Sequence, residues 1–158
     1  MILAGSSSIS MWHGAKNLFD DYKVINTAIG GTKVTDWLRI YKKKIVRYSP
    51  DVVLFYCGAN DICDGHETSG VENAGNTKRL LLKIRKHLKR TKIFYISINH
   101  CNRNPGAWYE IDVSNRIMKD FCDSHRRMFY IDIVGESLLP DGTPDPVLFR
   151  ADALHPSK

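Results

Sequence analysis

Residues 51–61, Asp-Val-Val-Leu-Phe-Tyr-Cys-Gly-Ala-Asn-Asp, decide the fold. They join a nearly unbroken apolar run to a turn made of Gly, Ala, Asn and Asp. Residues 92–98, Lys-Ile-Phe-Tyr-Ile-Ser-Ile, form a second run of the same kind. Strands covered on both faces have this composition, because neither face meets water. The two runs therefore predict buried parallel strands in an α/β domain.

Shorter β-rich runs and helical stripes surround these two strands. We expect further strands at 2–4, 23–26 and 129–133, which with the two buried strands make five. Apolar residues recur at helical spacing between the strands. These residues are Val34, Trp37, Leu38, Tyr41 and Ile45, then Leu80, Leu81, Ile84 and Leu88, then Ile111, Met118, Phe121 and Cys122. A fainter helix at 10–19 is interrupted by Gly14.

The alternation of strands and helices predicts the architecture. It indicates a three-layer α/β/α sandwich with right-handed crossovers. We expect a five-stranded parallel sheet in the flavodoxin-like order 2-1-3-4-5, with ligands bound beyond the carboxyl ends of the strands. The length of 158 residues suits one domain, 1–158, large enough to bury its core without disulfides or metal.

The composition and the lengths of the apolar runs indicate the class of protein and its cellular location. The chain is 43% hydrophobic and 25% charged, as in ordinary globular proteins. It begins directly with a strand, which leaves no room for a signal peptide, and no apolar run reaches the roughly 20 residues of a membrane span. We therefore expect a cytoplasmic protein with no membrane span.

Charge and cysteine usage indicate no special partner. The net charge is +6, with much of the excess at 42–44 and 83–90. Both runs fall on expected helices, so a solvated outer face is the simpler interpretation and a polyanion site is the alternative. Aromatic interleaving is absent there, and we expect no nucleic-acid partner. The cysteines, Cys57, Cys63, Cys101 and Cys122, lack zinc-site spacing and indicate buried or idle thiols.

Two candidate catalytic groups stand at opposite ends of the chain. Residues 5–8, Gly-Ser-Ser-Ser, follow the first strand, where a serine hydroxyl can project into the cleft; helix capping is the alternative use. Asp152 and His155 are three positions apart near the last residue. A carboxylate at that spacing can fix the imidazole tautomer so that the other nitrogen accepts a proton from serine. Such a pair also occurs by chance.

Candidate oxyanion donors follow the second and third strands. A glycine in 28–32, Ala-Ile-Gly-Gly-Thr, lets the main chain approach a ligand with its N–H exposed, or forms a turn that begins a helix. Asn60 presents an amide at the same sheet edge, or belongs to a local Asn-Asp turn.

Together these blocks resemble the SGNH hydrolases, also called GDSL-type esterases, over essentially the whole chain. The first block matches Gly5-Ser6-Ser7, the second Gly31 with Gly30 as the alternative, the third Gly58, Asn60 and Asp61, and the last Asp152, His155 and Pro156. The Gly-Ser-Ser-Ser-Ile first block is similar to a bacterial acylhydrolase branch. Two departures stand out: Ser6 replaces the usual aspartate, and the chain ends three residues after His155. We therefore expect the domain to lack the closing helix of family members.

The resemblance implies a serine esterase that cleaves short-chain acyl or acetyl esters of carbohydrate or lysolipid type. Ser7 is then the nucleophile, His155 the base and Asp152 its partner, with no metal or cofactor. The Ser7 and Gly31 N–H groups and the Asn60 amide form the oxyanion hole. The alternative is a non-catalytic ligand-binding or interaction module on the same fold.

Aromatic and basic residues near the expected cleft are candidates for binding a small-molecule ester. Trp12 and Trp108 lie in or beside cleft loops, where they form an apolar wall or pack in the core. We expect Arg103 either to contact a polar or anionic group of the substrate or to be exposed to solvent. Short loops predict an open, shallow site that favours short acyl chains.

Overall fold

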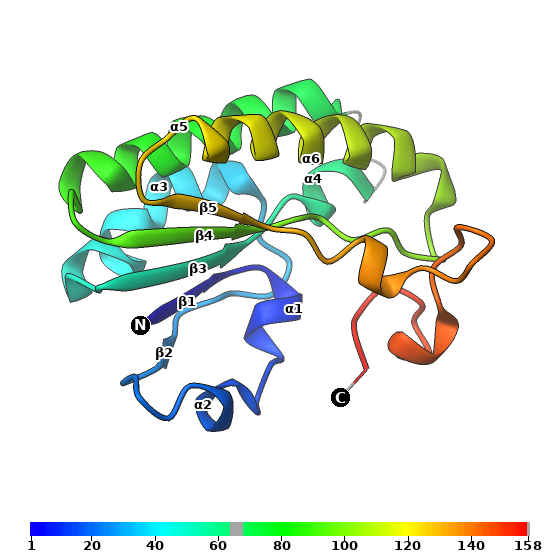
Figure 1. The fold of residues 1–158 in the computed structure, drawn as a ribbon, viewed down its shortest axis with the longest axis horizontal. Coiled ribbons are helices and arrows are strands. Elements are labelled where there is room, and N and C mark those ends of the chain that lie inside the picture. Colours follow the sequence, from blue (N-terminus) through cyan, green and yellow to red (C-terminus); the bar gives the residue numbers. More distant parts are fainter. Residues whose placement is uncertain (64–67, 158) are drawn as a thin grey trace.

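A parallel sheet forms the centre of the molecule, with its strands in the order β2-β1-β3-β4-β5 (Figure 1). The computed structural model describes residues 1–63 and 68–157; Lys158, the last residue of the predicted domain, lies outside them. The strands are β1 Ile2–Gly5, β2 Ile25–Asn26, β3 Val52–Tyr56, β4 Lys92–Ile96 and β5 Met128–Ile131. The predicted fold class and strand order are confirmed.

Three long helices cover one face of the sheet. They are α3 Val34–Lys44, α5 Gly70–His87 and α6 Trp108–Asp123, and Figure 1 shows them stacked on the same side. Successive strand residues point to opposite faces, so alternate positions meet these helices. The resulting main core includes Ile2, Ala4, Val53, Phe55, Ile93 and Tyr95 from the strands and Trp37, Leu80, Leu81, Ile84 and Met118 from the helices.

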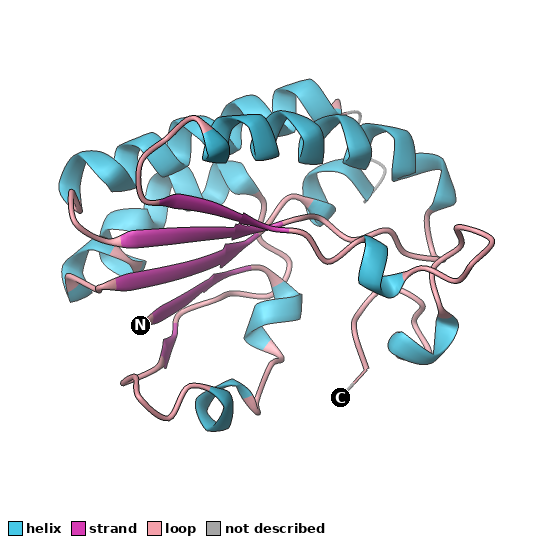
Figure 2. Cartoon of the chain, in the orientation of Figure 1, coloured by secondary structure: helices cyan, strands magenta, loops and turns pink. Residues whose placement is uncertain are grey.

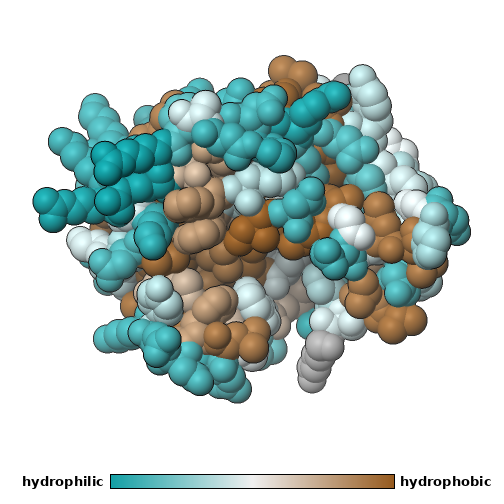
Figure 3. Space-filling view, viewed as in Figure 1, coloured by the Kyte–Doolittle hydropathy of each residue, from teal (hydrophilic) through white to brown (hydrophobic). Residues whose placement is uncertain are grey.

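The opposite face is covered more thinly. Below the sheet in Figure 1 lie two single-turn helices, α1 Ser7–Ser10 and α2 Ala15–Leu18. A second core of Leu3, Ile9, Ala15, Leu54 and Tyr56 packs there. Farther along this face the rings of Phe94 and Phe129 stack 4.7 Å apart, and Phe129 is 41% exposed. Figure 3 accordingly shows apolar surface, in brown, across the middle of the molecule.

Several boundaries differ from the sequence-based expectation. The strand expected at 23–26 is only Ile25–Asn26, because β2 is an edge strand whose ladder with β1 spans two residue pairs. The faint helix at 10–19 is instead α1 and α2, separated near Gly14, which is the N-cap residue of α2. The expected turn after β3 is the short helix α4, Ala59–Cys63. Five residues are too few to show a helical period.

The chain after β5 remains at the carboxyl ends of the strands. Figure 2 shows this stretch as loop with short helical turns, η3 Gly135–Ser137 and η4 Pro146–Leu148. Earlier turns of the same kind are η1 Val46–Tyr48 and η2 Pro105–Ala107. None of the helices in the described residues is both long and apolar enough to span a membrane.

Candidate active site

A sharp turn between β1 and α1 presents Ser7. Gly5 has φ +135°, and a Cβ at this position would lie 1.8 Å from the carbonyl oxygen of Tyr56 on β3. Only glycine therefore lets the end of β1 approach β3 so closely. The Ser6 N–H then donates to the same carbonyl at 2.9 Å, and the next residue begins α1. The hydroxyl of Ser7 is thereby placed at the carboxyl edge of the sheet.

His155 contacts Ser7 across almost the full length of the chain. Its Nε2 lies 2.8 Å from Ser7 Oγ, and its Nδ1 lies 2.7 Å from Asp152 Oδ2. With the ring proton on Nδ1, the imidazole donates to the carboxylate and its Nε2 accepts from the serine hydroxyl. This geometry allows a hydroxyl nucleophile, a general base and an orienting carboxylate to act together.

The turn that carries His155 is organised by Asp152. Its Oδ1 accepts the N–H groups of Leu154 at 3.0 Å and His155 at 2.9 Å. Ala153, between Asp152 and Leu154, has φ 54°, and its carbonyl accepts the Arg103 N–H at 3.2 Å. The backbone N–H of His155, its imidazole and the Leu154 N–H hold the pKa of Asp152 well below its ordinary value. The carboxylate therefore stays ionised at neutral and mildly acidic pH.

The candidate oxyanion donors differ in their surroundings. Asn60, on the first turn of α4, lines the cavity described below and is 8% exposed. Its Nδ2 donates to Thr32 O at 3.0 Å, which uses one of its two N–H bonds. Neither Gly31, which has φ +75°, nor Gly30 lines the cavity; a Cβ built on Gly30 would lie 3.9 Å from Ser7 Cβ. Ser7 itself is in the first turn of α1, where backbone N–H groups have no intrahelical partner.

Asp61, next to Asn60 on α4, connects α4 to the start of α3. It is 2% exposed, and both carboxylate oxygens accept the N–H of Val34, at 3.2 and 3.1 Å. Val34 is the first residue of α3, so Asp61 ties the start of α3 to α4. Burial raises the pKa of Asp61 from 3.8 to about 6, although the Val34 N–H and Lys33 act in the opposite direction.

We expect the Asp61→Asn variant to remove a pH-dependent cost of folding. Between about pH 4 and pH 6 the folded chain keeps a proton that the unfolded chain releases, so stability falls as the pH rises. Asparagine has no charge to desolvate and still accepts from Val34. The parent's free energy of unfolding, measured in urea, should fall from pH 4 to pH 7 by on the order of 2 kcal/mol more than the variant's. Parallel curves for the two proteins would contradict this.

A cavity of about 660 Å³ adjoins Ser7 and His155. Its apolar walls come from α1 and the loop after it, from the strand ends, and from the C-terminal segment. These residues are Ile9, Met11, Trp12, Tyr56, Ile96, Ile133, Phe149 and Leu154. The site is thus larger than the shallow one expected from the loop lengths, because the thinly covered sheet face forms part of it.

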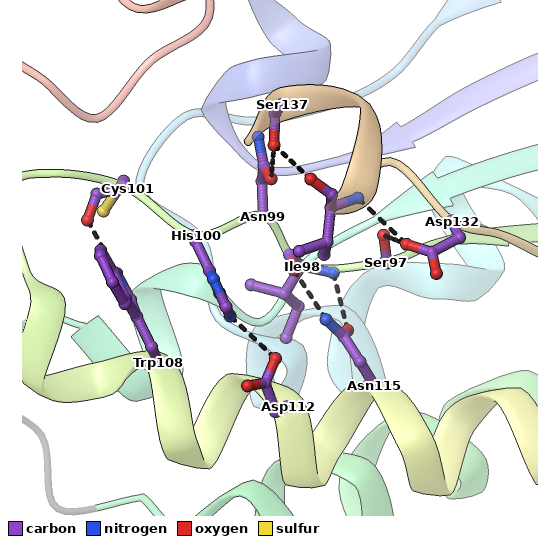
Figure 4. Close-up of polar contacts among 11 residues, drawn as sticks. Ser97, Ile98, Asn99, His100, Cys101, Trp108, Asp112, Asn115, Asp132 and Ser137 are labelled. Atoms are coloured by element: carbon purple, nitrogen blue, oxygen red, sulfur yellow. Dashed lines mark hydrogen bonds and ion pairs between the residues drawn. The ribbon is translucent and has the colours of Figure 1, made fainter. Parts of the chain in front are cut away.

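The three candidate substrate-binding residues have different placements. Trp12 lines the cavity, whereas Arg103 and Trp108 are not among its lining residues. The Trp108 indole stacks on His100 with ring centroids 5.1 Å apart and donates to Cys101 O at 3.0 Å (Figure 4). The side chain of Arg103 is exposed, while its backbone N–H holds Ala153.

The segment after β4 is held by side-chain hydrogen bonds (Figure 4) and contributes residues to the cavity wall. The Asn115 side chain bonds both the N–H and the carbonyl of Ile98, at 2.9 and 2.8 Å, and the Ser137 hydroxyl donates to Asn99 Oδ1 at 2.6 Å. Asn99 and Cys101 line the cavity beside these contacts. Sequence reasoning missed both residues; their position just beyond a buried strand was the available signal.

A sequence model of the GDSL-like lipase/acylhydrolase family matches residues 6–158. The chain belongs to this family. The match includes Ser7, Asn60, Asp152 and His155, so the residues assembled above all lie within the GDSL-like region. No curated protein sequence matches the chain.

Solved structures share the GDSL-like fold at low sequence identity. The lipase/acylhydrolase from Enterococcus faecalis is 20% identical with a TM-score of 0.80, over 99% of this chain and 87% of that one. A catalytic mutant of an acetylxylan esterase from Geobacillus stearothermophilus is 17% identical with a TM-score of 0.77, over 99% and 86%. A GDSL-like lipase from Bacteroides thetaiotaomicron is 15% identical with a TM-score of 0.74, over 99% and 78%.

Proposed function

We propose that the protein is a serine esterase that cleaves short-chain acyl or acetyl carboxylic esters through an acyl-enzyme. The observation that carries the proposal is the continuous contact from Ser7 through His155 to Asp152. Membership of a lipase and acylhydrolase family supports ester hydrolysis in general. The proposed steps use only groups of the protein and water, so activity should persist in EDTA.

Acylation uses the contacts already present in the free enzyme. Ser7 Oγ attacks the ester carbonyl carbon while its proton passes to His155 Nε2. Ionised Asp152 stabilises the imidazolium that forms. The negative charge on the former carbonyl oxygen is met by the Ser7 N–H, the Gly31 N–H and the free N–H of the Asn60 amide. Gly30 is the alternative to Gly31, and its closeness to Ser7 supports it. His155 then protonates the leaving alcohol.

Deacylation repeats these steps with water. Water takes the place of the alcohol, gives a proton to His155 and attacks the acyl carbon, after which Ser7 recovers the proton and the acid leaves. The similarity to an acetylxylan esterase supports an acetylated carbohydrate as one substrate class. Trp12 on the cavity wall provides an apolar, stacking surface for such a group or for a lipid tail.

A serine-directed fluorophosphonate tests this proposal directly. We expect the chain to hydrolyse p-nitrophenyl acetate and to be labelled once, at Ser7, because phosphonylation requires an activated hydroxyl. Heat-unfolded chain is the matched control and should not be labelled. Folded chain that binds acyl esters but neither turns them over nor reacts with the probe would favour the non-catalytic binding module.

Acyl chain length should affect turnover through the apolar cavity. Each buried methylene contributes about 0.8 kcal/mol, so p-nitrophenyl butyrate should exceed the acetate in kcat/KM by about tenfold. The Trp12→Ala variant should reduce this preference, since it removes apolar wall. A rate that is flat or falls from acetate to butyrate would show that the acyl chain does not enter this cavity.

A further inference from the structure

Two cysteines from different elements meet on the wall of the cavity. Cys63 ends α4 and Cys101 follows β4, and both line the cavity that Ser7 and His155 also line. Their side chains lie close enough for Cys63 to act on the Cys101 thiol. The ester chemistry proposed above uses neither thiol, so the pair is a cluster of nucleophilic groups without an assigned role.

The surroundings of Cys101 favour its thiolate. The Cys63 side chain, the backbone N–H groups of Asn104 and Arg103, and the positive charge of Arg103 all stabilise negative charge on its sulfur. These contacts lower the pKa of Cys101 although burial opposes them. A thiolate, unlike a thiol, is the form that attacks peroxides and disulfides.

The backbones on both sides of the pair are also held together. The Asn104 side chain donates to the carbonyl oxygen of Cys63. The Trp108 indole donates to the carbonyl oxygen of Cys101 (Figure 4). Asn104 N–H further bonds Cys101 O at 3.4 Å. The end of α4 and the segment at 101–104 are therefore adjacent main-chain segments, so the contact between the sulfurs does not depend on flexible surface side chains.

We propose that Cys63 and Cys101 form a peroxide-sensitive dithiol, whose oxidation to a disulfide lowers ester turnover. The Cys101 thiolate attacks hydrogen peroxide, which gives a sulfenic acid and, after proton uptake, one water. The Cys63 sulfur then attacks the sulfenic sulfur, the S–S bond forms and a second water leaves. Two thiols and one peroxide thus give one disulfide and two waters, and a dithiol reductant reverses the change.

Oxidation would affect turnover because α4 and the segment after Cys101 both hold groups of the candidate active site. α4 bears Asn60, and the segment after Cys101 bears the Arg103 N–H that holds Ala153 in the turn of His155. A disulfide needs a sulfur separation of about 2.05 Å, far below that of two thiols in van der Waals contact, so at least one segment must move. A displacement of about 1 Å in an active site can cost about 10²-fold in rate. This part rests on the proposed function.

The test combines mass measurement with activity. Native chain treated with hydrogen peroxide should lose two titratable thiols and two hydrogen atoms in mass, with a cross-linked peptide joining residues 63 and 101. Turnover of p-nitrophenyl acetate should fall about tenfold and recover with dithiothreitol. The Cys63→Ala and Cys101→Ala variants should form no such bond and lose this response. Cys122→Ala is the matched control, since Cys122 is 1% exposed in the main core, and it should respond like the parent.

The outcomes separate the two proposals. The dithiol would be overturned if no bond formed between residues 63 and 101, if a different cysteine pair formed, or if Cys101 alone were over-oxidised. A bond between residues 63 and 101 that leaves turnover intact would overturn the regulation. The thiol count and the peptide map need no substrate. Chain that forms the disulfide but never hydrolyses an ester would overturn the proposed function and the regulation, and would leave the dithiol site standing.

Discussion

Replacement of Ser7 by alanine is expected to lower turnover of p-nitrophenyl acetate by about 10⁴-fold or more. Ser7 Oγ is the hydroxyl in contact with His155, at 2.8 Å. Alanine removes both the attacking atom and the proton that His155 would take, while the turn after Gly5 keeps its backbone. The kcat of purified variant and parent, measured at the same pH, tests the expectation.

Ser10→Ala is the matched control for this loss. Ser10 ends the same single-turn helix, and its hydroxyl donates to Ser7 O at 3.1 Å rather than contacting His155. Its removal should change kcat by less than about tenfold. If Ser7→Ala keeps parental activity while folded, the nucleophile is a different group. Circular dichroism and thermal unfolding of both variants show whether folding is intact.

The second large effect is expected for Asp152→Asn, with a fall in kcat of about 10³ to 10⁴-fold near pH 7. The remaining oxygen can still accept from Leu154 and His155 N–H, so the turn should persist. The new NH₂ group faces His155 Nδ1, which the carboxylate contacts at 2.7 Å in the parent. The imidazole must then accept at Nδ1 and carry its proton on Nε2, where it can no longer take one from Ser7.

The pKa shift of Asp152 sharpens this test. Because its contacts hold the pKa of Asp152 well below the ordinary value, the parent keeps the carboxylate ionised at every pH used for an esterase assay. The parent and the asparagine variant should therefore differ throughout that range. Asp141→Asn is the control, since Asp141 is exposed and, within the described residues, its side chain accepts hydrogen bonds only from Thr143. Equal kcat values for Asp152→Asn and parent would remove Asp152 from the mechanism.

The two variants should not be additive. Residues that act as one catalytic unit do not contribute independently to kcat. Adding Asp152→Asn to Ser7→Ala should therefore lower kcat little beyond the effect of Ser7→Ala alone. A double variant that falls by the product of both effects would indicate that the residues act independently, contrary to the contact through His155.

Much of the fold followed from local patterns. The apolar runs at 51–57 and 92–98 predicted β3 and β4, and the stripes beginning at Val34, Leu80 and Ile111 predicted the three long helices. These elements bury one or both faces, so burial imposes a period that the sequence displays. Short elements such as β2, α1 and α4 have too few residues to display a period, so their bounds were missed.

The candidate site was predictable only in part. The blocks around Ser7, Asn60 and His155 were recognisable because their chemistry requires particular residue types in a family order. Residues that contribute only shape, such as Met11, Ile96 and Phe149 in the cavity, have no such signature. The placements of Trp108 and Arg103 depended on contacts with His100, Cys101 and Ala153, which no local pattern reveals.

The sequence by itself determined the α/β class, the parallel order of the sheet and the chemical identity of the groups that can act on an ester. Local periodicity and residue chemistry are properties of the chain, so they need no knowledge of distant contacts. Only the tertiary structure decided that His155 reaches Ser7, that a thinly covered sheet face opens into an apolar cavity, and that Cys63 meets Cys101. Each of these depends on segments far apart in sequence that packing brings to one edge of the sheet.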